Sequence, residues 1–208
     1  SSETYQFEIL VIDNGSQDAS KQVITELCQK LPGLRLISHK SYGKGWAVKQ
    51  GMLEAKGDFR LFTDADNSTD IAQLDKLLPY ALEGYDVVIS SRRIEGSEIT
   101  RKQPWHRQLL GDIFAALVQT IVPLGIKDTQ NGFKLFGRKV AEDIFPRQSM
   151  YFWAFDIEIL AMAKNRGYKI KEVPITWINA DDSKMNFKGM VRMLFEVINI
   201  RLMLLMNK

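Results

Sequence analysis

Short apolar runs that suit β-strands alternate with segments of helical periodicity along the first 91 residues of the chain. Strands are predicted at residues 7–12, 34–38, 59–63 and 86–90. Helices are predicted at residues 19–30 and 70–83, with another between the glycine-rich loop at 43–45 and Gly57. Strands joined in this way by helical crossovers predict an α/β fold, in which a mostly parallel, twisted sheet carries helices on both faces.

The loops that follow three of these strands are expected to carry function, because ligands on such sheets bind at the carboxyl ends of the strands. These loops come after Ile12, Thr63 and Ser90. Beyond residue 91 the sequence predicts a helix at 105–122, a strand at 132–136 and a helix from about residue 156. Residues 169–177 have strand character, and the Pro174 within them favours an edge or bulged position.

The composition is that of a globular protein, with 45% hydrophobic and 25% charged residues. A length of 208 residues is enough to bury one substantial core. We expect one domain over residues 1–180 and a trailing segment over 181–208. The single Cys28 leaves no intramolecular disulfide within this sequence and no reason to invoke an oxidising compartment.

Two carboxylates, Asp64 and Asp66, stand where the strand at 59–63 ends and a loop begins. A turn just past a strand can bring two such side chains onto one ion. Hard divalent cations such as Mg²⁺ are commonly held by one or two carboxylates plus substrate phosphates, so the pair is a candidate site for a metal and a diphosphate. The alternative is that the polar residues 66–70 only cap the following helix.

A second acidic loop, Asp13-Asn14-Gly15-Ser16-Gln17-Asp18, stands at the end of the first predicted strand. Together with Asp64-Ala65-Asp66 it resembles two motifs of the inverting family 2 glycosyltransferases with the GT-A fold. These motifs are Asp-(Asp/Asn)-Gly-Ser-x-Asp and Asp-x-Asp. The resemblance implies a nucleotide-sugar donor and a divalent metal, Mg²⁺ or Mn²⁺.

The resemblance also implies roles for these residues. Asp13 is expected to contact the base or ribose of the nucleotide, and Asp64 and Asp66 to hold the nucleotide and the metal. The other donor-binding residues of the first loop are expected to be Gly15, Ser16 and Asp18. A tight turn with a helix cap is the alternative explanation of this loop.

The segment Gly43-Lys44-Gly45-Trp46-Ala47-Val48-Lys49-Gln50-Gly51 resembles a motif of the members that load sugars onto polyprenyl phosphates. These members include dolichyl-phosphate glucosyltransferases and dolichyl-phosphate mannose synthases, and their motif is Gly-Lys-Gly-x-Ala-x-x-x-Gly. The resemblance implies that glycines such as Gly45 let the backbone approach the donor and that Lys44 meets its phosphates. The alternative is an ordinary glycine-bounded helix start with Lys44 in solvent.

The segment Asp128-Thr129-Gln130-Asn131-Gly132-Phe133-Lys134-Leu135-Phe136 is similar to Asp-Thr-Gln-Cys-Gly-Phe-Lys-Leu-Phe of the glucosyltransferase branch and departs from it only at Asn131. The similarity favours glucose as the sugar, with mannose next, and UDP-glucose as the donor. It implies that Asp128 and Gln130 lie beside the donor sugar and the acceptor. A strand-initiating turn would use the same residues.

Ser91-Arg92, with Arg107 fifteen residues later, matches the arginines that contact the lipid phosphate in this branch. Arginine suits the task because its guanidinium meets phosphate oxygens bidentately. The neighbouring Arg93, Arg101 and Lys102 are better explained as a solvated basic loop near an anionic membrane.

A phosphate acceptor requires no strong general base, because its second pKa of about 6 leaves it largely dianionic at neutral pH. Catalysis is then expected to be positioning and charge stabilisation. Arg92 and Arg107 would place the attacking oxygen, while the metal at Asp66 stabilises the departing nucleoside diphosphate. Attack opposite the leaving group would invert the anomeric carbon.

Residues 184–208 carry five basic side chains and one acidic side chain on an apolar background. Apolar residues from Phe187 to Leu202 recur at helical spacing, which predicts an amphipathic helix in the membrane interface. Packing of that helix on the protein's own core explains the pattern equally well. The longest apolar run near the end of the chain, residues 202–206, is far shorter than the ~20 residues that span a bilayer. We expect peripheral membrane association, on the cytoplasmic face.

Two other functions stay open. A sugar nucleotidyltransferase would need a Gly-rich, Arg-containing loop after an early strand, and the sequence has none. A non-catalytic donor-binding or membrane-recruited fragment fits one departure: the family pattern begins with a strand ending in Pro-Ala-Tyr-Asn-Glu, and this chain begins just after it. The first strand is thus expected to be missing from the nucleotide pocket. No nucleic-acid partner is expected, because no nucleic-acid-binding motif accompanies the basic patches.

Overall fold

The computed structural model describes residues 5–40, 42–100, 105–178 and 187–206, with the side chains of all but 105–107 and 187–188 among them. The strands are β1 (Ile9–Asn14), β2 (Leu34–His39), β3 (Phe59–Thr63), β4 (Val87–Ser91), β5 (Glu98–Ile99), β6 (Phe133–Gly137), β7 (Ile170–Pro174) and β8 (Thr176–Trp177). The helices are α1 (Ser20–Lys30), α2 (Lys44–Glu54), α3 (Leu74–Leu82), α4 (Trp105–Ile121), α5 (Arg138–Ile144), α6 (Phe155–Asn165) and α7 (Phe187–Met206). Two 3₁₀ turns, η1 (Ile71–Gln73) and η2 (Phe145–Arg147), adjoin α3 and α5.

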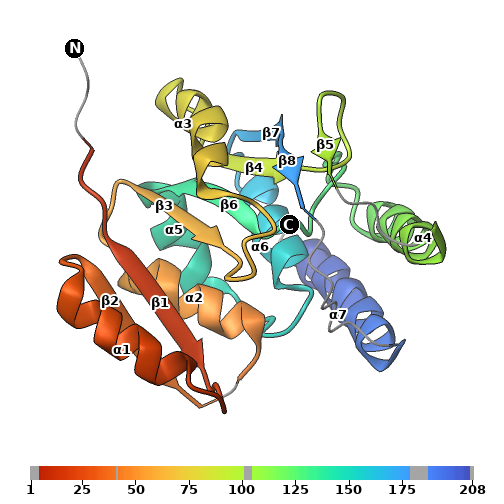
Figure 1. Cartoon of the computed structure of the whole chain (residues 1–208). Helices are drawn as coiled ribbons and strands as arrows, with labels where there is room; N and C mark the ends of the chain where they lie inside the picture. Colours follow the sequence, from red (N-terminus) through yellow and green to blue (C-terminus); the bar gives the residue numbers. More distant parts are fainter. Residues whose placement is uncertain (1–4, 41, 101–104, 179–186, 207–208) are drawn as a thin grey trace.

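A four-stranded sheet in the order β3-β6-β4-β7 forms the centre of the molecule (Figure 1). β4 and β7 pair in parallel, from Val87 opposite Ile170 to Ser91 opposite Pro174. β6 runs antiparallel to both of its neighbours. β1 pairs in parallel with β2, and β5 with β8. The strands linked by helical crossovers follow the predicted parallel arrangement, and β6 is the strand that makes the sheet mixed.

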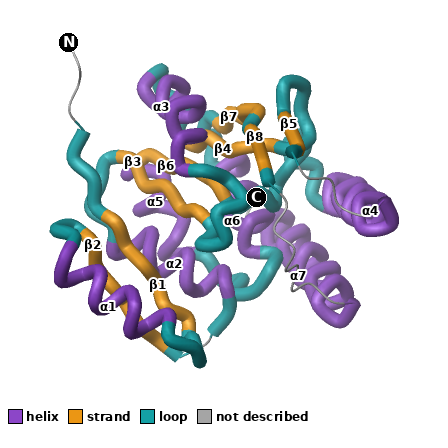
Figure 2. The backbone as a smooth tube through the Cα atoms, in the orientation of Figure 1, coloured by secondary structure: helices purple, strands orange, loops and turns teal. Residues whose placement is uncertain are grey.

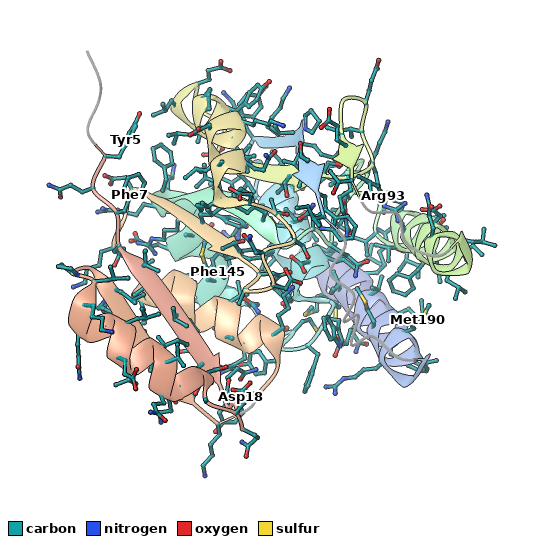
Figure 3. All side chains as sticks on the ribbon, in the orientation of Figure 1. Tyr5, Phe7, Asp18, Arg93, Phe145 and Met190 are labelled. Carbon is teal, nitrogen blue, oxygen red and sulfur yellow. The ribbon has the colours of Figure 1, made fainter. Side chains whose placement is uncertain are left out.

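Both faces of this sheet are covered, because alternate residues of a strand point to opposite sides. Val87 and Ile89 of β4 lie in one core with residues of α4 to α7, whereas Val88 lies in a second core with Leu77 of α3. Figure 2 shows α3 on one side of the sheet and α5 and α6 on the other. In Figure 3 Phe145 lies in the interior and Asp18 lies at the outer end of β1. The predicted two-sided covering is confirmed.

Most predicted elements lie within two residues of their predicted bounds. The helix predicted at 70–83 divides into η1 and α3, with the side chain of Asp70 accepting a hydrogen bond from the Ala72 N–H at the start of η1. Among the described strands β7 pairs with β4 alone, so it lies at an edge, which was one of the two positions that Pro174 favoured. The short elements α5, β5 and β8 were not predicted as separate elements.

The terminal helix α7 is apolar on two faces. One face joins the first core through the fully buried Met193, Val197 and Ile200. The other face exposes a stripe of apolar side chains, which consists of Val191, Phe195, Ile198, Leu202 and Leu205. The core packing that the sequence left open is therefore present, and an apolar stripe still faces outward. Among the described residues, no helix is long and apolar enough to cross a membrane.

Candidate active site

The ends of three strands meet at one edge of the central sheet. Thr63, the last residue of β3, lies opposite Phe133, the first residue of β6. Asp64 follows β3, Arg92 follows β4, and the segment 128–132 leads into β6. Because β6 is antiparallel to its neighbours, its start lies beside their carboxyl ends. The loops after Thr63 and Ser90, which the sequence predicted to carry function, therefore converge on one segment.

Asp64 is paired with Lys44, the first residue of α2. The Lys44 ammonium lies 2.7 Å from Asp64 Oδ1, and both side chains are about one-third exposed. The Asp64 N–H donates to the Gly132 carbonyl at 3.2 Å. A Cβ on residue 132 would lie 2.1 Å from Asp64 Oδ2, so any larger residue there would displace this carboxylate. Lys44 is thus part of the strand-edge site and not only a solvated charge.

Asp66 lies in the exposed turn after Asp64. Its Oδ1 accepts a hydrogen bond from the Ser68 N–H at 2.9 Å within this turn, whereas the helix cap that the sequence left as an alternative is made by Asp70. In the part of the chain that the structure describes, no cluster of three or more His, Cys, Asp or Glu side chains is placed to hold a metal. Among the described side chains of these four types, the predicted site thus offers the two carboxylates Asp64 and Asp66, and a bound phosphate or water could supply further oxygen ligands.

Arg92 and Asp128 form a second ion pair at the same edge. The guanidinium donates from Nε to Asp128 Oδ2 at 2.7 Å and from Nη2 to Oδ1 at 2.8 Å. It also stacks over Trp177, with Cζ 5.1 Å from the ring centre. Burial would raise the pKa of Asp128, but the Arg92 charge and its hydrogen bonds hold this pKa below its usual value. The sequence assigned these residues separate roles, and the structure makes them a unit.

A third ion pair, between Lys134 of β6 and Asp156 of α6, is completely buried beneath this edge. Lys134 also donates to the Asn131 carbonyl. Burial lowers the pKa of Lys134 and raises that of Asp156, and the charge of each partner opposes the shift of the other. The sequence analysis did not select Lys134 as a site residue. The feature that could have indicated it is a lysine inside the otherwise apolar strand 133–136.

The loop after β1 is organised around Asp13, which is nearly fully buried. Asp13 Oδ1 accepts from the Ser16 N–H at 2.9 Å and Oδ2 accepts from the Ser38 hydroxyl at 2.7 Å. Hydrogen bonds from Ser16 and then Ser38 lower the pKa of Asp13 to about 2. Gly15 takes a φ of 83°, and Asp18 accepts from the Ser20 N–H at the start of α1. The turn that the sequence left as an alternative is thus present, whereas the N-cap of α1 is Ala19, which makes no side-chain cap hydrogen bond.

No hydrogen bond or ion pair among the described residues joins this first loop to Asp64 or Arg92. The structure therefore groups the predicted site residues into two sets. One set surrounds the segment 128–132, and the other lies at the end of β1.

The glycines of the 43–45 loop allow the segment 148–155 to pack closely against this loop. A Cβ at Gly43, whose φ is 109°, would lie 2.3 Å from the Tyr151 carbonyl, and one at Gly45 would lie 2.6 Å from Phe155 Cβ. The Gln148 side chain donates to the Gly45 carbonyl at 2.8 Å. The start of α2, which carries Lys44, is thus held in place by the segment 148–155.

Of two further predicted acceptor residues, one contacts α7 and the other belongs to α4. Gln130 contacts α7, where its Nε2 lies 3.3 Å from Met193 Sδ. Arg107 belongs to the first turn of α4, but its side chain lies outside the described residues. Arg93 forms a surface ion pair with Asp112 at 2.6 Å.

Several known proteins resemble the chain. The sequence model of glycosyl transferase family 2 matches residues 1–145. The chain is 36% identical over 203 residues to a dolichyl-phosphate beta-glucosyltransferase of Trichomonas vaginalis. The matched region covers 94% of the chain and 60% of that protein. It is 36% identical over 206 residues to the dolichyl-phosphate beta-glucosyltransferase of Dictyostelium discoideum, with coverage of 95% and 63%. The chain thus spans about 60% of the length of these curated relatives.

A crystal structure of glucosyl-3-phosphoglycerate synthase from Mycobacterium tuberculosis shares the architecture. It superposes with a TM-score of 0.69 at 17% identity and covers 95% of this chain and 68% of that one. That crystal contains Mn²⁺, uridine diphosphate and glucosyl-3-phosphoglycerate. The likeness confirms the predicted fold.

Proposed function

The chain belongs to glycosyl transferase family 2, and we propose that it transfers a hexose from a nucleotide-diphosphate sugar to a polyprenyl phosphate of the dolichyl type. The names of its relatives support this acceptor and favour glucose over mannose. UDP-glucose is the proposed donor, which the uridine diphosphate in the mycobacterial synthase supports.

One observation carries the proposal. The segment 128–132 touches two ion pairs at the strand edge, since Asp128 binds Arg92 and Gly132 packs against Asp64 beside Lys44. The first pair presents a guanidinium for an acceptor phosphate. The second presents a carboxylate and an ammonium for a metal and a diphosphate. Donor and acceptor groups are thus within one short segment of each other, as transfer between them requires.

A divalent cation, Mg²⁺ or Mn²⁺, is proposed at Asp64 and Asp66. The side chains fit such an ion, because hard cations combine one or two carboxylates with phosphate oxygens. When bound, the ion would supply charge stabilisation for the departing diphosphate. The other proposed donor-binding residues are Asp13, Gly15, Ser16, Asp18, Lys44 and Gly45.

Arg92, with Arg107 and Gln130, is proposed to hold the acceptor phosphate. The Nε and Nη2 atoms of Arg92 donate to Asp128, and Nη1 has no acceptor within the described part of the chain, which leaves it for a phosphate oxygen. That phosphate's oxygen forms a bond to the anomeric carbon. The bond from this carbon to the diphosphate breaks, and its electron pair leaves with the nucleoside diphosphate. Attack opposite the leaving group inverts the carbon.

The outer stripe of α7, defined above, is proposed to meet the membrane that holds this lipid. α4 contacts α7, and the two helices lie side by side at one end of the molecule (Figure 2). α4 also exposes apolar side chains, namely Leu109, Leu110, Ile113 and Leu117. Residues 184–208 carry five basic residues and one acidic residue, of which Arg192 and Glu196 form an ion pair at 3.1 Å. An apolar surface with basic neighbours suits the interface of an anionic membrane. The cytoplasmic face and a membrane role for all of 181–208 stay predictions.

Transfer of labelled sugar to a polyprenyl phosphate tests the function. The protein is incubated with Mg²⁺, polyprenyl phosphate in detergent, and either labelled UDP-glucose or a labelled mannose donor. Glucosyl lipid is the expected product. Binding of UDP without transfer of either sugar would contradict the proposal and favour a donor-binding module without catalytic activity.

A further inference from the structure

Lys44 engages the whole carboxylate of Asp64. Its ammonium lies 2.7 Å from Oδ1 and 2.9 Å from Oδ2, so one cation bridges both oxygens. Any divalent cation held by Asp64 would have to compete with this ammonium for the negative charge of the carboxylate.

Asp64 is the fixed partner of this pair. Its backbone N–H is bonded to the Gly132 carbonyl, and its carboxylate is packed so closely on Gly132 that a methyl group there would overlap it. Lys44, in contrast, carries its charge on a flexible four-carbon stem, although both side chains are about one-third exposed. Exchange of the contact therefore requires movement of the lysine.

A metal ion by itself finds few ligands here. Within the described residues no third carboxylate, histidine or cysteine joins Asp64 and Asp66, and Asp66 uses one oxygen for the Ser68 N–H. The Lys44 ammonium also neutralises Asp64 and would repel a second cation at close range. A diphosphate removes both obstacles, because it supplies oxygens to the metal and an alternative anion to the lysine.

We propose that Lys44 makes metal binding depend on the donor diphosphate. The lysine holds Asp64 until a nucleoside diphosphate binds, then its ammonium moves to a phosphate oxygen and Asp64 becomes a metal ligand. This inference rests on the proposed donor site at Asp64. It adds an order of events, in which the diphosphate and the metal bind cooperatively through one exchanging side chain.

Binding of Mn²⁺ tests the inference without any sugar transfer. Free Mn²⁺ is measured by electron paramagnetic resonance with and without UDP, for the wild-type chain and for Lys44→Met. Wild-type protein should bind Mn²⁺ about tenfold more tightly, or better, when UDP is present. Lys44→Met should bind Mn²⁺ more tightly than wild type without UDP, and UDP should change its affinity less.

Two controls accompany this experiment. Lys44→Arg keeps the charge and should keep the UDP dependence, whereas Lys76→Met removes an exposed charge on α3 and should behave as wild type. Equal Mn²⁺ affinity of Lys44→Met and wild type without UDP overturns the switch and leaves the proposed function standing. Tight binding of Mn²⁺ to wild type without UDP also overturns it. Absence of UDP binding to wild type, measured by calorimetry, overturns the proposed donor site and the switch together.

Discussion

Asp128 accepts three hydrogen bonds from Arg92, one from the backbone N–H at 2.9 Å and two from the guanidinium at 2.7 and 2.8 Å. The carboxylate is almost fully buried, while the arginine side chain is one-quarter exposed. Asp128 therefore fixes the direction of the guanidinium, and the exposed part of Arg92 faces whatever binds at the strand edge. Asp128 thus positions the guanidinium of Arg92 but does not use all of its N–H donors.

Arg92→Lys should weaken the acceptor site selectively. Lysine keeps the charge but cannot form two parallel hydrogen bonds to Asp128. Loss of one charged hydrogen bond, worth about 2 kcal/mol, corresponds to a rise of roughly thirtyfold in KM for the lipid phosphate. Steady-state kinetics with varied lipid measure this rise. Arg93→Lys, at the surface pair with Asp112, is the matched control and should change little.

Donor binding separates this role from a general loss of structure. UDP affinity of Arg92→Lys, measured by calorimetry, should equal that of wild type. An equal loss of UDP affinity and lipid affinity would contradict an acceptor role for Arg92.

Gly132→Ala should disable the donor site while the fold persists. The added methyl would overlap Asp64 Oδ2, so the carboxylate must leave its position. Misplacement of a reactive group by about 1 Å can cost roughly hundredfold in rate, and we expect a loss of that size in transfer. Gly137→Ala, at the other end of β6, is the control, because the nearest atom to its methyl would lie 3.6 Å away. If Gly132→Ala transferred sugar at the wild-type rate, this position of the Asp64 carboxylate would not be required for function.

Lys134→Met should destabilise the protein by about 3–5 kcal/mol, because it leaves the buried Asp156 without its partner. Urea unfolding measures this change. The double variant Lys134→Met, Asp156→Leu removes both charges and should unfold at higher urea than Lys134→Met alone. If the double variant were instead as unstable as the two single changes added together, the two side chains would not act as a pair.

The stability contribution of Asp13 should depend on pH. Its pKa of about 2 lies below the ordinary value of 3.8, so the folded state favours the ionised form. The contribution is therefore present at neutral pH and is lost as the pH falls from about 4 towards 2. Asp13→Asn should lower the melting temperature at pH 7 and converge with wild type near pH 2. Ser38→Ala, which removes one donor, should show the same trend with a smaller gap. A gap that is independent of pH would contradict this account.

The sequence predicted the elements well where hydrophobic periodicity is long and clear. The strands at 59–63 and 86–90 are bounded by turns and carry apolar residues, and they were placed within one residue. The short helix α5 was not predicted, because its seven residues follow β6 directly and leave little room for a periodic pattern. The place of β6 between β3 and β4 was also not predictable, since the order of strands in a sheet depends on contacts between distant segments.

The same limit applies to the site. Motif similarity selected Lys44, Asp64, Arg92 and Asp128 one by one. Their pairing joins residues that lie 20 and 36 positions apart in the chain, and nothing in local sequence specifies such partners. The buried Lys134–Asp156 pair was missed for a related reason, because a charge inside an apolar strand has meaning only once its partner is known.

The outer stripe of α7 gives the membrane proposal a direct test. Phe195 is 64% exposed, and the helix is anchored by Met193 and Val197 on its opposite side, so a change at residue 195 should leave the core intact. Phe195→Glu replaces an apolar contact with a charge that an anionic surface repels, and it should lower binding to vesicles of anionic lipid by about tenfold or more. Vesicle sedimentation measures this. Val23→Glu on α1, where the native side chain is 51% exposed, adds the same charge far from α7 and should bind as wild type. Equal losses of vesicle binding in both variants would mean that the change in net charge causes the loss. Unchanged binding of Phe195→Glu would mean that this face of α7 does not contact the membrane.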